Sequence, residues 1–236
     1  MKYFFKNEIV DYIFINNKHD DTILFLHGWG GNKSSFAETI NLTKNRFNIL
    51  SITVPTIQPT ISVWDMFDYA TLVENIMLAN SIENPIVVCH SFGFRIAMLL
   101  NKKIKIKKIV TTGGAGLKKY IKISKININN NKILLKNHKF NYLFKKIASK
   151  DYLFLSPINK KTFKNIINLN INFATRFNCP VLLFWGTKDK DTPIWIAKKL
   201  KKHNTAHLII TKSDHFAYLK ENTRFNHEII KFLKNA

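Results

Sequence analysis

The stretch Pro85–Leu100 reads PIVVCHSFGFRIAMLL and decides the fold. Its first five residues form a continuous apolar run, which is typical of a strand buried on both faces, and its last seven suit a helix. The turn His90-Ser91-Phe92-Gly93 lies between them. A serine on a sharp strand-to-helix turn projects its hydroxyl away from the sheet, and the backbone N–H groups that follow it are unbonded at the helix start. We therefore predict that Ser91 is a nucleophile.

Strands and helices alternate along the rest of the chain. A hairpin is predicted over residues 3–16, and further buried strands over 22–26, 47–54, 106–111, 180–185 and 207–211. Helices are predicted over 65–78, 92–100, 194–202 and 224–233. This alternation is typical of a mostly parallel central sheet flanked by helices. The predicted fold class is therefore α/β.

One long region interrupts the alternation after the sixth predicted strand. Residues 117–172 contain no clear strand, and they include many lysines but a single acidic residue, Asp151. The apolar residues in this region suit short amphipathic helices, and Pro, Gly and Ser are too sparse for a flexible linker. We predict a lysine-rich helical cap over 117–172, inserted into a core domain made of 1–116 and 173–236.

The charge balance is strongly basic, with 37 Lys and Arg against 15 Asp and Glu and a net charge of +22. A basic face that neutralises phosphates is typical of nucleic-acid-binding proteins. Almost all of the basic residues are lysines, however, whereas arginine is the residue that binds phosphate and base edges bidentately. No nucleic-acid-binding motif is present either. We therefore expect no nucleic-acid partner.

The apolar runs and the cysteines indicate the compartment. The longest apolar runs are much shorter than the ~20 residues of a membrane-spanning helix, and the first residues do not form the apolar core of a signal peptide. The two cysteines, Cys89 and Cys179, stand in apolar runs and support neither a disulfide framework nor a zinc site. We predict a cytoplasmic protein that holds no metal.

Three further predicted strands are followed by residues that could bind a substrate or take part in catalysis. The strand over 22–26 runs into the glycine-rich loop 27–30, HGWG, which lacks the spacing of a phosphate-binding motif. The strand over 180–185 is followed by Asp189 and Asp191, and the last strand is followed by His215. Because the carboxyl ends of parallel strands open on the same edge of a sheet, we expect an acid and His215 to lie near Ser91.

With these motifs in the order serine, acid and histidine, the sequence resembles the α/β-hydrolase family. The oxyanion loop H-G-x-G of that family is matched by 27–30, and its nucleophile elbow by 89–93. Its G-x-x-D acid loop is matched by 186–189, and its late histidine by His215. The resemblance covers nearly the whole chain. It is strongest to small capped hydrolases and esterases of low-GC bacteria and extends more distantly to C–C-bond hydrolases.

The resemblance implies a serine hydrolase that cleaves a carboxylic ester of a small or medium acyl group and uses no cofactor. Ser91 would be the nucleophile, His215 the general base and Asp189 the acid of a catalytic triad. The backbone N–H groups of Trp29 and Phe92 would form the oxyanion hole. The sequence leaves Asp191 and Asp214 open as alternative acids, because they lie close to Asp189 and His215 along the chain.

Several other residues are expected at or near the substrate. The predicted substrate contacts are His27, Gly28, Phe92 and Phe154. His27, like His90, also suits a structural role beside the site, because no carboxylate or cysteine accompanies it at metal-ligand spacing. Among the aromatic residues of the motifs and the cap, we expect Phe92 to reach the pocket and the others to belong mainly to the core.

The sequence departs from the family pattern at three places. Cys89 stands where glycine is commonest, and Phe94 stands where a second glycine often follows. A bulky residue at position 94 would either crowd the helix against the sheet or line the pocket. The loop 53–59 lacks the family's D-x-P-G-x-G pattern, which predicts a different pocket wall.

Other interpretations stay open. The same triad would also serve a C–C-bond hydrolase or a thioesterase, and a non-catalytic binding protein could retain the fold. The lysines of the cap form either a solvated face or a surface that attracts anionic substrates or an anionic membrane, where each basic residue contributes about 1 kcal/mol. The sequence does not indicate the oligomeric state.

Overall fold

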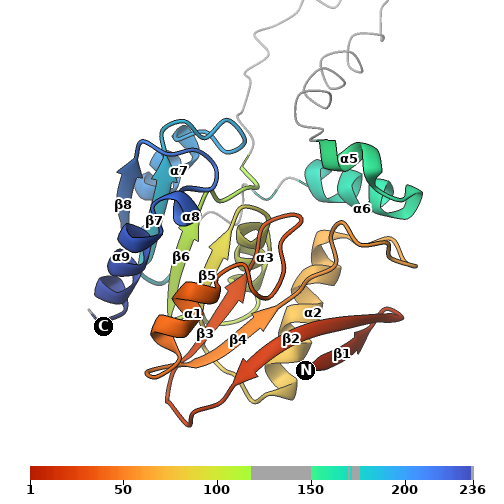
Figure 1. The fold of residues 1–236 in the computed structure, drawn as a ribbon, viewed down its shortest axis with the longest axis horizontal. Helices are drawn as coiled ribbons and strands as arrows, with labels where there is room; N and C mark the ends of the chain where they lie inside the picture. Colours follow the sequence, from red (N-terminus) through yellow and green to blue (C-terminus); the bar gives the residue numbers. More distant parts are fainter. Residues whose placement is uncertain (118–149, 170, 172–175, 235–236) are drawn as a thin grey trace, which may run out of the picture.

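The computed structural model describes residues 1–117, 150–169, 171 and 176–234 and contains an eight-stranded sheet (Figure 1). The strands are β1 Lys2–Phe5, β2 Glu8–Ile15, β3 Thr22–Leu26, β4 Asn48–Ile52, β5 Ile86–His90, β6 Lys108–Thr112, β7 Val181–Gly186 and β8 Ala206–Thr211. Their order in the sheet is β1-β2-β4-β3-β5-β6-β7-β8. The pairs β1–β2 and β2–β4 are antiparallel, and all the other pairs are parallel. The predicted α/β class and mostly parallel sheet are confirmed.

Helices cover both faces of the sheet. They are α1 Ala37–Thr43, α2 Met66–Ala79, α3 Phe92–Leu100, α7 Trp195–His203, α8 Ala217–Lys220 and α9 Asn222–Lys234. Buried side chains of α2, α3 and α7 form one apolar cluster with the sheet, and those of α1, α8 and α9 form the other. Figure 1 shows the sheet between these two layers. Alternate residues of β3 enter the two clusters, as the two-residue repeat of a strand requires.

The buried runs of the sequence explain the parallel part of the sheet. Every residue of β3, β4, β5, β6 and β7 is buried, because helices cover both of their faces. The helix predicted to begin near Asp65 does so, since the Asp65 carboxylate accepts hydrogen bonds from Phe67 N and Asp68 N in a capping box. The sequence did not predict α1 and α8. Both are short, and neither has a side-chain cap.

Two helices lie in the described part of the predicted cap. They are α5 Lys150–Phe154 and α6 Pro157–Asn168, and Figure 1 shows them beyond the carboxyl ends of the parallel strands. Ser156 caps the start of α6, since its hydroxyl accepts from Asn159 N, and Pro157 is the first residue of the helix. Much of the predicted cap lies outside the described residues. The division into core and cap therefore stays a prediction.

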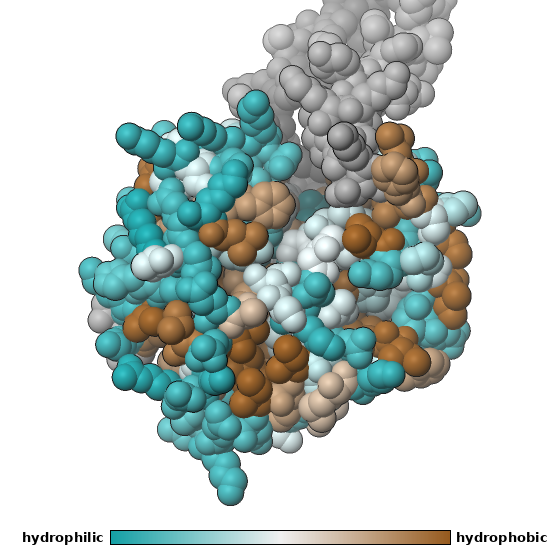
Figure 2. Space-filling model, viewed as in Figure 1, coloured by the Kyte–Doolittle hydropathy of each residue, from teal (hydrophilic) through white to brown (hydrophobic). Residues whose placement is uncertain are grey.

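The face seen in Figure 2 is largely hydrophilic, and apolar side chains occur on it in small separate groups. None of the helices in the described part of the chain is both long enough and apolar enough to cross a bilayer.

Candidate active site

Ser91 stands at a strained turn between β5 and α3. Its backbone has φ 46° and ψ −108°, a combination that is unfavourable for a residue with a side chain. Neighbouring backbone holds this conformation, because Ser91 N donates to Thr112 O at 3.1 Å and Ser91 O accepts from Ala115 N at 3.0 Å. The turn therefore presents the hydroxyl at the carboxyl edge of the sheet, as the sequence predicted.

Two glycines allow backbone segments to approach closely around this edge. A Cβ atom at Gly93 would lie 2.2 Å from Leu26 O, so the start of α3 packs directly against the end of β3. A Cβ atom at Gly186 would lie 2.2 Å from Ser213 O, so the end of β7 packs in the same way against the loop that carries His215. Any side chain at either position would push these segments apart.

The two departures within the elbow are accommodated in the core. Cys89 is fully buried, and its Sγ donates to Val110 O at 3.4 Å. Phe94 is also fully buried, with its ring 5.8 Å from that of Phe177. Gly114 makes room for it, since a Cβ atom there would lie 2.7 Å from the Phe94 ring. Phe94 is therefore a core residue.

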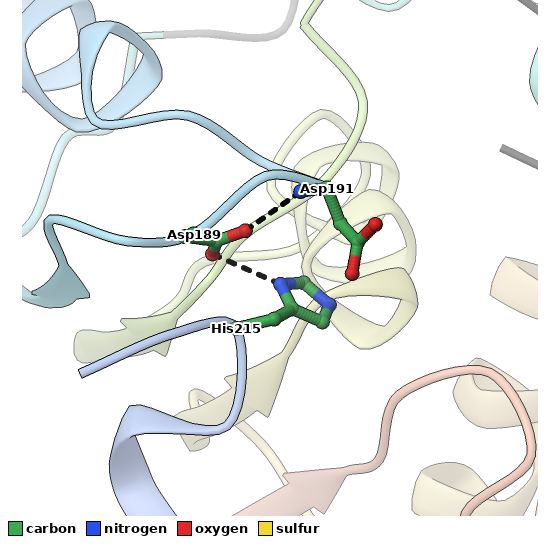
Figure 3. Close-up of side chains that lie close together, drawn as sticks. All are labelled: Asp189, Asp191 and His215. Carbon is green, nitrogen blue, oxygen red and sulfur yellow. Dashed lines mark hydrogen bonds and ion pairs between the residues drawn. The ribbon is translucent and has the colours of Figure 1, made fainter. Parts of the chain in front are cut away.

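A continuous chain of hydrogen bonds joins Ser91, His215 and Asp189. Ser91 Oγ lies 2.9 Å from His215 Nε2, and His215 Nδ1 lies 2.9 Å from Asp189 Oδ2. Figure 3 shows the Asp189–His215 pair, with the imidazole directed at the carboxylate. Because a carboxylate only accepts, Nδ1 carries the hydrogen and Nε2 is left to accept from the Ser91 hydroxyl. Three residues far apart in the sequence thus meet at one edge of the sheet.

The Asp189 carboxylate is buried and fully engaged. It accepts from Asp191 N at 3.0 Å, from Thr192 N at 2.8 Å and from His215 Nδ1. The Thr192 hydroxyl lies 2.7 Å from Asp189 Oδ2 and 2.9 Å from Gly113 O, and its single hydrogen satisfies one of them at a time. Burial alone would raise the pKa of Asp189, but the interactions with His215 and Thr192 outweigh it and lower that pKa below its ordinary value. The carboxylate therefore stays ionised at neutral pH.

The other two candidate acids are engaged elsewhere. Asp214 accepts from Lys220 Nζ at 2.5 Å and from Phe216 N at 3.1 Å. The hydrogen bond from Lys220 is the main cause that lowers the pKa of Asp214. The Asp191 side chain is exposed, and this residue contributes its backbone N–H to Asp189. Among the acids that the structure describes, only Asp189 hydrogen-bonds to the imidazole.

Two acids and the histidine of this site have the donor atoms that a cation could use. Asp189, Asp191 and His215 each offer one ligand atom, and these atoms lie within 4.8 Å of one another (Figure 3). However, N–H groups of Asp191, Thr192 and His215 already point at the Asp189 carboxylate. A cation on these oxygens would have to displace the contact with His215. We therefore treat the cluster as a hydrogen-bonded unit and assign no metal to it.

The glycine-rich loop after β3 lies directly against the serine. A Cβ atom at Gly28 would lie 3.4 Å from Ser91 Cβ and 2.4 Å from His90 Nδ1. Within the described chain, the backbone N–H groups of Trp29 and Phe92 donate to no other residue. The rings of these two residues meet edge to face, with centroids 5.5 Å apart. The two predicted oxyanion donors therefore come from adjacent segments at the same edge.

Two buried histidines support this loop. His27 Nδ1 lies 2.7 Å from Gly28 O, and His27 Nε2 accepts from Val54 N at 3.0 Å. His90 Nε2 lies 3.1 Å from His215 O. Burial lowers the pKa of His27 to about 4 and, with the nearby His215, that of His90 to about 3, so both are neutral. Both ring nitrogens of His27 therefore have partners within the protein, and a contact of this ring with substrate stays a prediction.

The aromatic residues singled out in the sequence differ in their burial. Phe92 is buried, with its ring between those of Trp29 and Tyr69, at centroid distances of 5.5 and 5.0 Å. Trp185 is in the core, as expected. Phe154 on α5 is 87% exposed, so its expected place in the core is wrong, and a contact with substrate stays a prediction.

Sequence reasoning missed a groove beside the site. Its volume is about 370 Å³, and it is lined by Gly28, Trp29, Gly30, Gly31, Ser35, Ile57, His90, Phe216 and Tyr218. Thr192, which contacts both the acid and the histidine, was also missed. The sequence signal for this residue is a threonine three positions after the acid, because its backbone N–H can then bond to the carboxylate across a tight turn.

Comparison with known proteins identifies the fold. No protein-family model and no curated protein sequence matches the chain. Among solved structures, an alpha/beta hydrolase enzyme from a Medee basin deep-sea metagenome library superposes with a TM-score of 0.74 at 15% identity, covering 100% of this chain and 98% of that one. The chain has the α/β-hydrolase fold. The expected fold is thereby confirmed.

Other structures with the α/β-hydrolase fold are similar to the same degree. An esterase from Exiguobacterium antarcticum has a TM-score of 0.70 at 14% identity, covering 96% of this chain and 95% of that one. A meta-cleavage product hydrolase from Pseudomonas fluorescens IP01 has a TM-score of 0.70 at 14% identity, covering 99% of this chain and 97% of that one. At such identities the likeness establishes the fold, and any function must be argued from the site.

Proposed function

We propose that the chain is a serine hydrolase that cleaves a carboxylic ester of a small or medium acyl group. The observation that carries this proposal is the unbroken hydrogen-bonded chain from Ser91 through His215 to Asp189, with 2.9 Å at each side of the imidazole. The nucleophile is thus within proton-transfer distance of the base, and the base is hydrogen-bonded to the acid that orients it, as this chemistry requires.

In the first half of the proposed reaction, Ser91 Oγ attacks the carbonyl carbon of the ester. The Oγ–H bond breaks, and the proton moves to His215 Nε2. Asp189 keeps the hydrogen on Nδ1 and stabilises the resulting imidazolium, since its lowered pKa keeps it ionised. The bond to the leaving alcohol then breaks, and that oxygen takes the proton from Nε2. The acyl group is left on Ser91.

In the second half, water replaces the alcohol. His215 Nε2 takes a proton from the water as its oxygen attacks the acyl carbon, and the bond to Ser91 Oγ then breaks with return of the proton to Oγ. The carboxylic acid leaves. In both halves, the negative charge that develops on the carbonyl oxygen would be bound by the N–H groups of Trp29 and Phe92. One such donor contributes about 2.7 to 4 kcal/mol to lowering the barrier.

The limit to small and medium acyl groups comes from the family resemblance. The groove of about 370 Å³ lies beside the site, but neither Ser91 nor His215 lines it, so its volume does not set the length of the acyl group. The series of esters described below tests this limit.

A C–C-bond hydrolase or thioesterase is a second candidate. The similarity to the meta-cleavage product hydrolase, at a TM-score of 0.70, favours keeping it open. The same three side chains could cleave either kind of bond, so the shape of the substrate pocket determines which substrate is cleaved. A non-catalytic binding protein is disfavoured, because the strained backbone of Ser91 stores energy that a simple binding loop has no need to hold.

Labelling with a fluorophosphonate probe, together with hydrolysis of p-nitrophenyl esters of increasing acyl length, tests the proposal. We expect labelling of the wild type at Ser91, loss of labelling in Ser91→Ala and His215→Ala, and turnover that declines for the longer esters. A panel of thioesters and dienoic acids tests the second candidate. Absence of both labelling and turnover would contradict the hydrolase proposal and favour a binding protein.

The remaining partner predictions depend on the lysine-rich cap. An anionic membrane contact or an attraction for anionic substrates predicts that turnover of anionic esters falls steeply as salt concentration rises. A salt-insensitive rate would leave the lysines as a solvated face. Absence of a nucleic-acid partner and a cytoplasmic location likewise stay predictions.

A further inference from the structure

Helix α6 is fixed to the loop that follows β4 by buried polar side chains. Asn159 is 1% exposed and donates to Thr56 O at 2.8 Å and to Gln58 O at 2.7 Å. Its side-chain oxygen accepts from Thr60 N at 3.1 Å. One turn later, Thr162 Oγ1 accepts from Trp64 N at 2.9 Å. These hydrogen bonds satisfy backbone N–H and C=O groups of a loop that lacks regular structure. Helix α6 and the loop therefore form one packed unit.

The other end of α6 is fixed to the helix that follows Ser91. Arg95 of α3 is buried and donates from Nη2 to Ile166 O and, at 3.1 Å, to Leu169 O. A cation at the last carbonyl groups of a helix is favourable, because these groups carry the negative end of the helix dipole. Helix α6 is therefore held at both ends relative to the candidate site.

From this fixed position, α6 reaches the oxyanion loop by two separate routes. The ring of Phe163 meets the ring of Trp29 edge to face, with centroids 5.2 Å apart. Asn159 binds the backbone oxygen of Thr56, whose hydroxyl accepts from Gly30 N at 3.3 Å. One route is apolar and the other is polar, and they hold consecutive residues of the same loop.

The oxyanion loop is held both by its own contacts and by contacts from α6. Gly28 O, which shares a peptide plane with the Trp29 N–H group, accepts from Gly31 N at 3.0 Å and lies 2.7 Å from His27 Nδ1. Trp29 lies between Gly28 and Gly30, and Gly30 has a positive φ of 79°. Because glycine restricts the backbone least of all residues, the contacts to the Trp29 ring and to Gly30 N add to this support.

We propose that α6 is a second positioning element of the oxyanion hole, beside the contacts to Gly28 O, with Phe163 holding the Trp29 indole and Asn159 holding Gly30 through Thr56. This inference rests on the proposed function. Phe163 and Asn159 are positioning residues, which set how well the Trp29 N–H group meets the developing oxyanion. Because that charge forms only in the transition state, their loss should lower kcat and leave KM nearly unchanged.

Two variants on the separate routes test the proposal. Phe163→Leu removes the ring contact, and Thr56→Val removes the hydroxyl that accepts from Gly30 N while keeping the side-chain shape. For each, we expect kcat for a p-nitrophenyl ester to fall about tenfold, less than the ~10²- to 10³-fold loss of a complete donor. Phe163→Tyr keeps the ring and should restore kcat. Lys164→Ala, an exposed change on the same helix, is the matched control.

A structural readout accompanies the kinetics. With ¹⁵N-tryptophan labelling, the backbone amide signal of Trp29 should shift in Thr56→Val, which removes no neighbouring ring, and stay in place in Lys164→Ala, whether or not the protein turns over an ester. A raised KM with unchanged kcat would make Phe163 a substrate-wall residue and overturn the proposal, as would an unshifted Trp29 amide. Absence of wild-type turnover would instead contradict the proposed function, and the amide shift would still decide the positioning role.

Discussion

The two buried histidines that support the site predict a specific loss of stability in acid. The pKa of His27 is lowered to about 4 and that of His90 to about 3, against 6.5 for a solvated imidazole. Below pH 6.5 the unfolded chain therefore binds two protons that the folded chain does not. The free energy of unfolding falls as the pH is lowered, since protons favour the state that binds more of them.

The expected size follows from the same shifts. Between pH 7 and pH 5, each histidine costs about 2 kcal/mol of stability, or about 4 kcal/mol for both, and the slope approaches about 2.7 kcal/mol per pH unit. Carboxylates with a lowered pKa, such as Asp189, lose their contribution only at lower pH, as they become protonated in the folded state. The window from pH 7 to 5 therefore reports mainly on the histidines.

Urea unfolding at a series of pH values measures this effect. His90→Gln removes one of the two protons and should reduce the slope by about half. His227→Gln changes an exposed histidine on α9 and should leave the slope as in the wild type. A free energy of unfolding that stays constant from pH 7 to 5, or a slope that His90→Gln does not change, would refute the assignment of two buried neutral imidazoles.

Three further predictions concern the acid, the elbow glycine and the thiols. Asp189→Asn should lower kcat about 10⁴-fold through loss of the required imidazole tautomer, whereas Asp191→Asn should stay near the wild type; equal losses in ester kinetics would contradict the choice of acid. Gly93→Ala should lower the melting temperature and abolish labelling of the serine, because its Cβ would lie 2.2 Å from a β3 carbonyl oxygen; an unchanged melting curve would argue against that contact. Burial raises the pKa of Cys89 to about 12 and that of Cys179 to about 11, so iodoacetamide at pH 8 should leave both unmodified until urea is added. Alkylation of either thiol in the native protein, detected by mass spectrometry, would contradict the burial of these cysteines.

The sequence was most informative where strands are buried on both faces. Such strands must be apolar at every position, so β3, β5 and β7 are visible as continuous runs, and the chemistry is found where each run ends. The serine, the glycine-rich loop and the late histidine could be located in this way. The turn around Ser91 was also predictable, because a strained backbone next to Gly93 has a recognisable pattern.

Other features depend on three-dimensional contacts that no spacing encodes. Three acids lie near the histidine along the chain, and only the coordinates show that Asp189 is buried against it while Asp214 pairs with Lys220. The role of Asn159 could not be predicted either, because its partners are about a hundred residues away. Phe154 was misassigned to the core because an aromatic residue is usually buried, whereas it is exposed here.

The most direct test of the central claim is the trapping of the acyl group on Ser91. Rapid mixing with p-nitrophenyl acetate should release a burst of p-nitrophenolate close to the enzyme concentration, and acid-quenched protein should carry one acetyl group on the peptide that contains Ser91. Turnover without a burst and without an acetylated Ser91, or an acetyl group on another residue, would contradict the account.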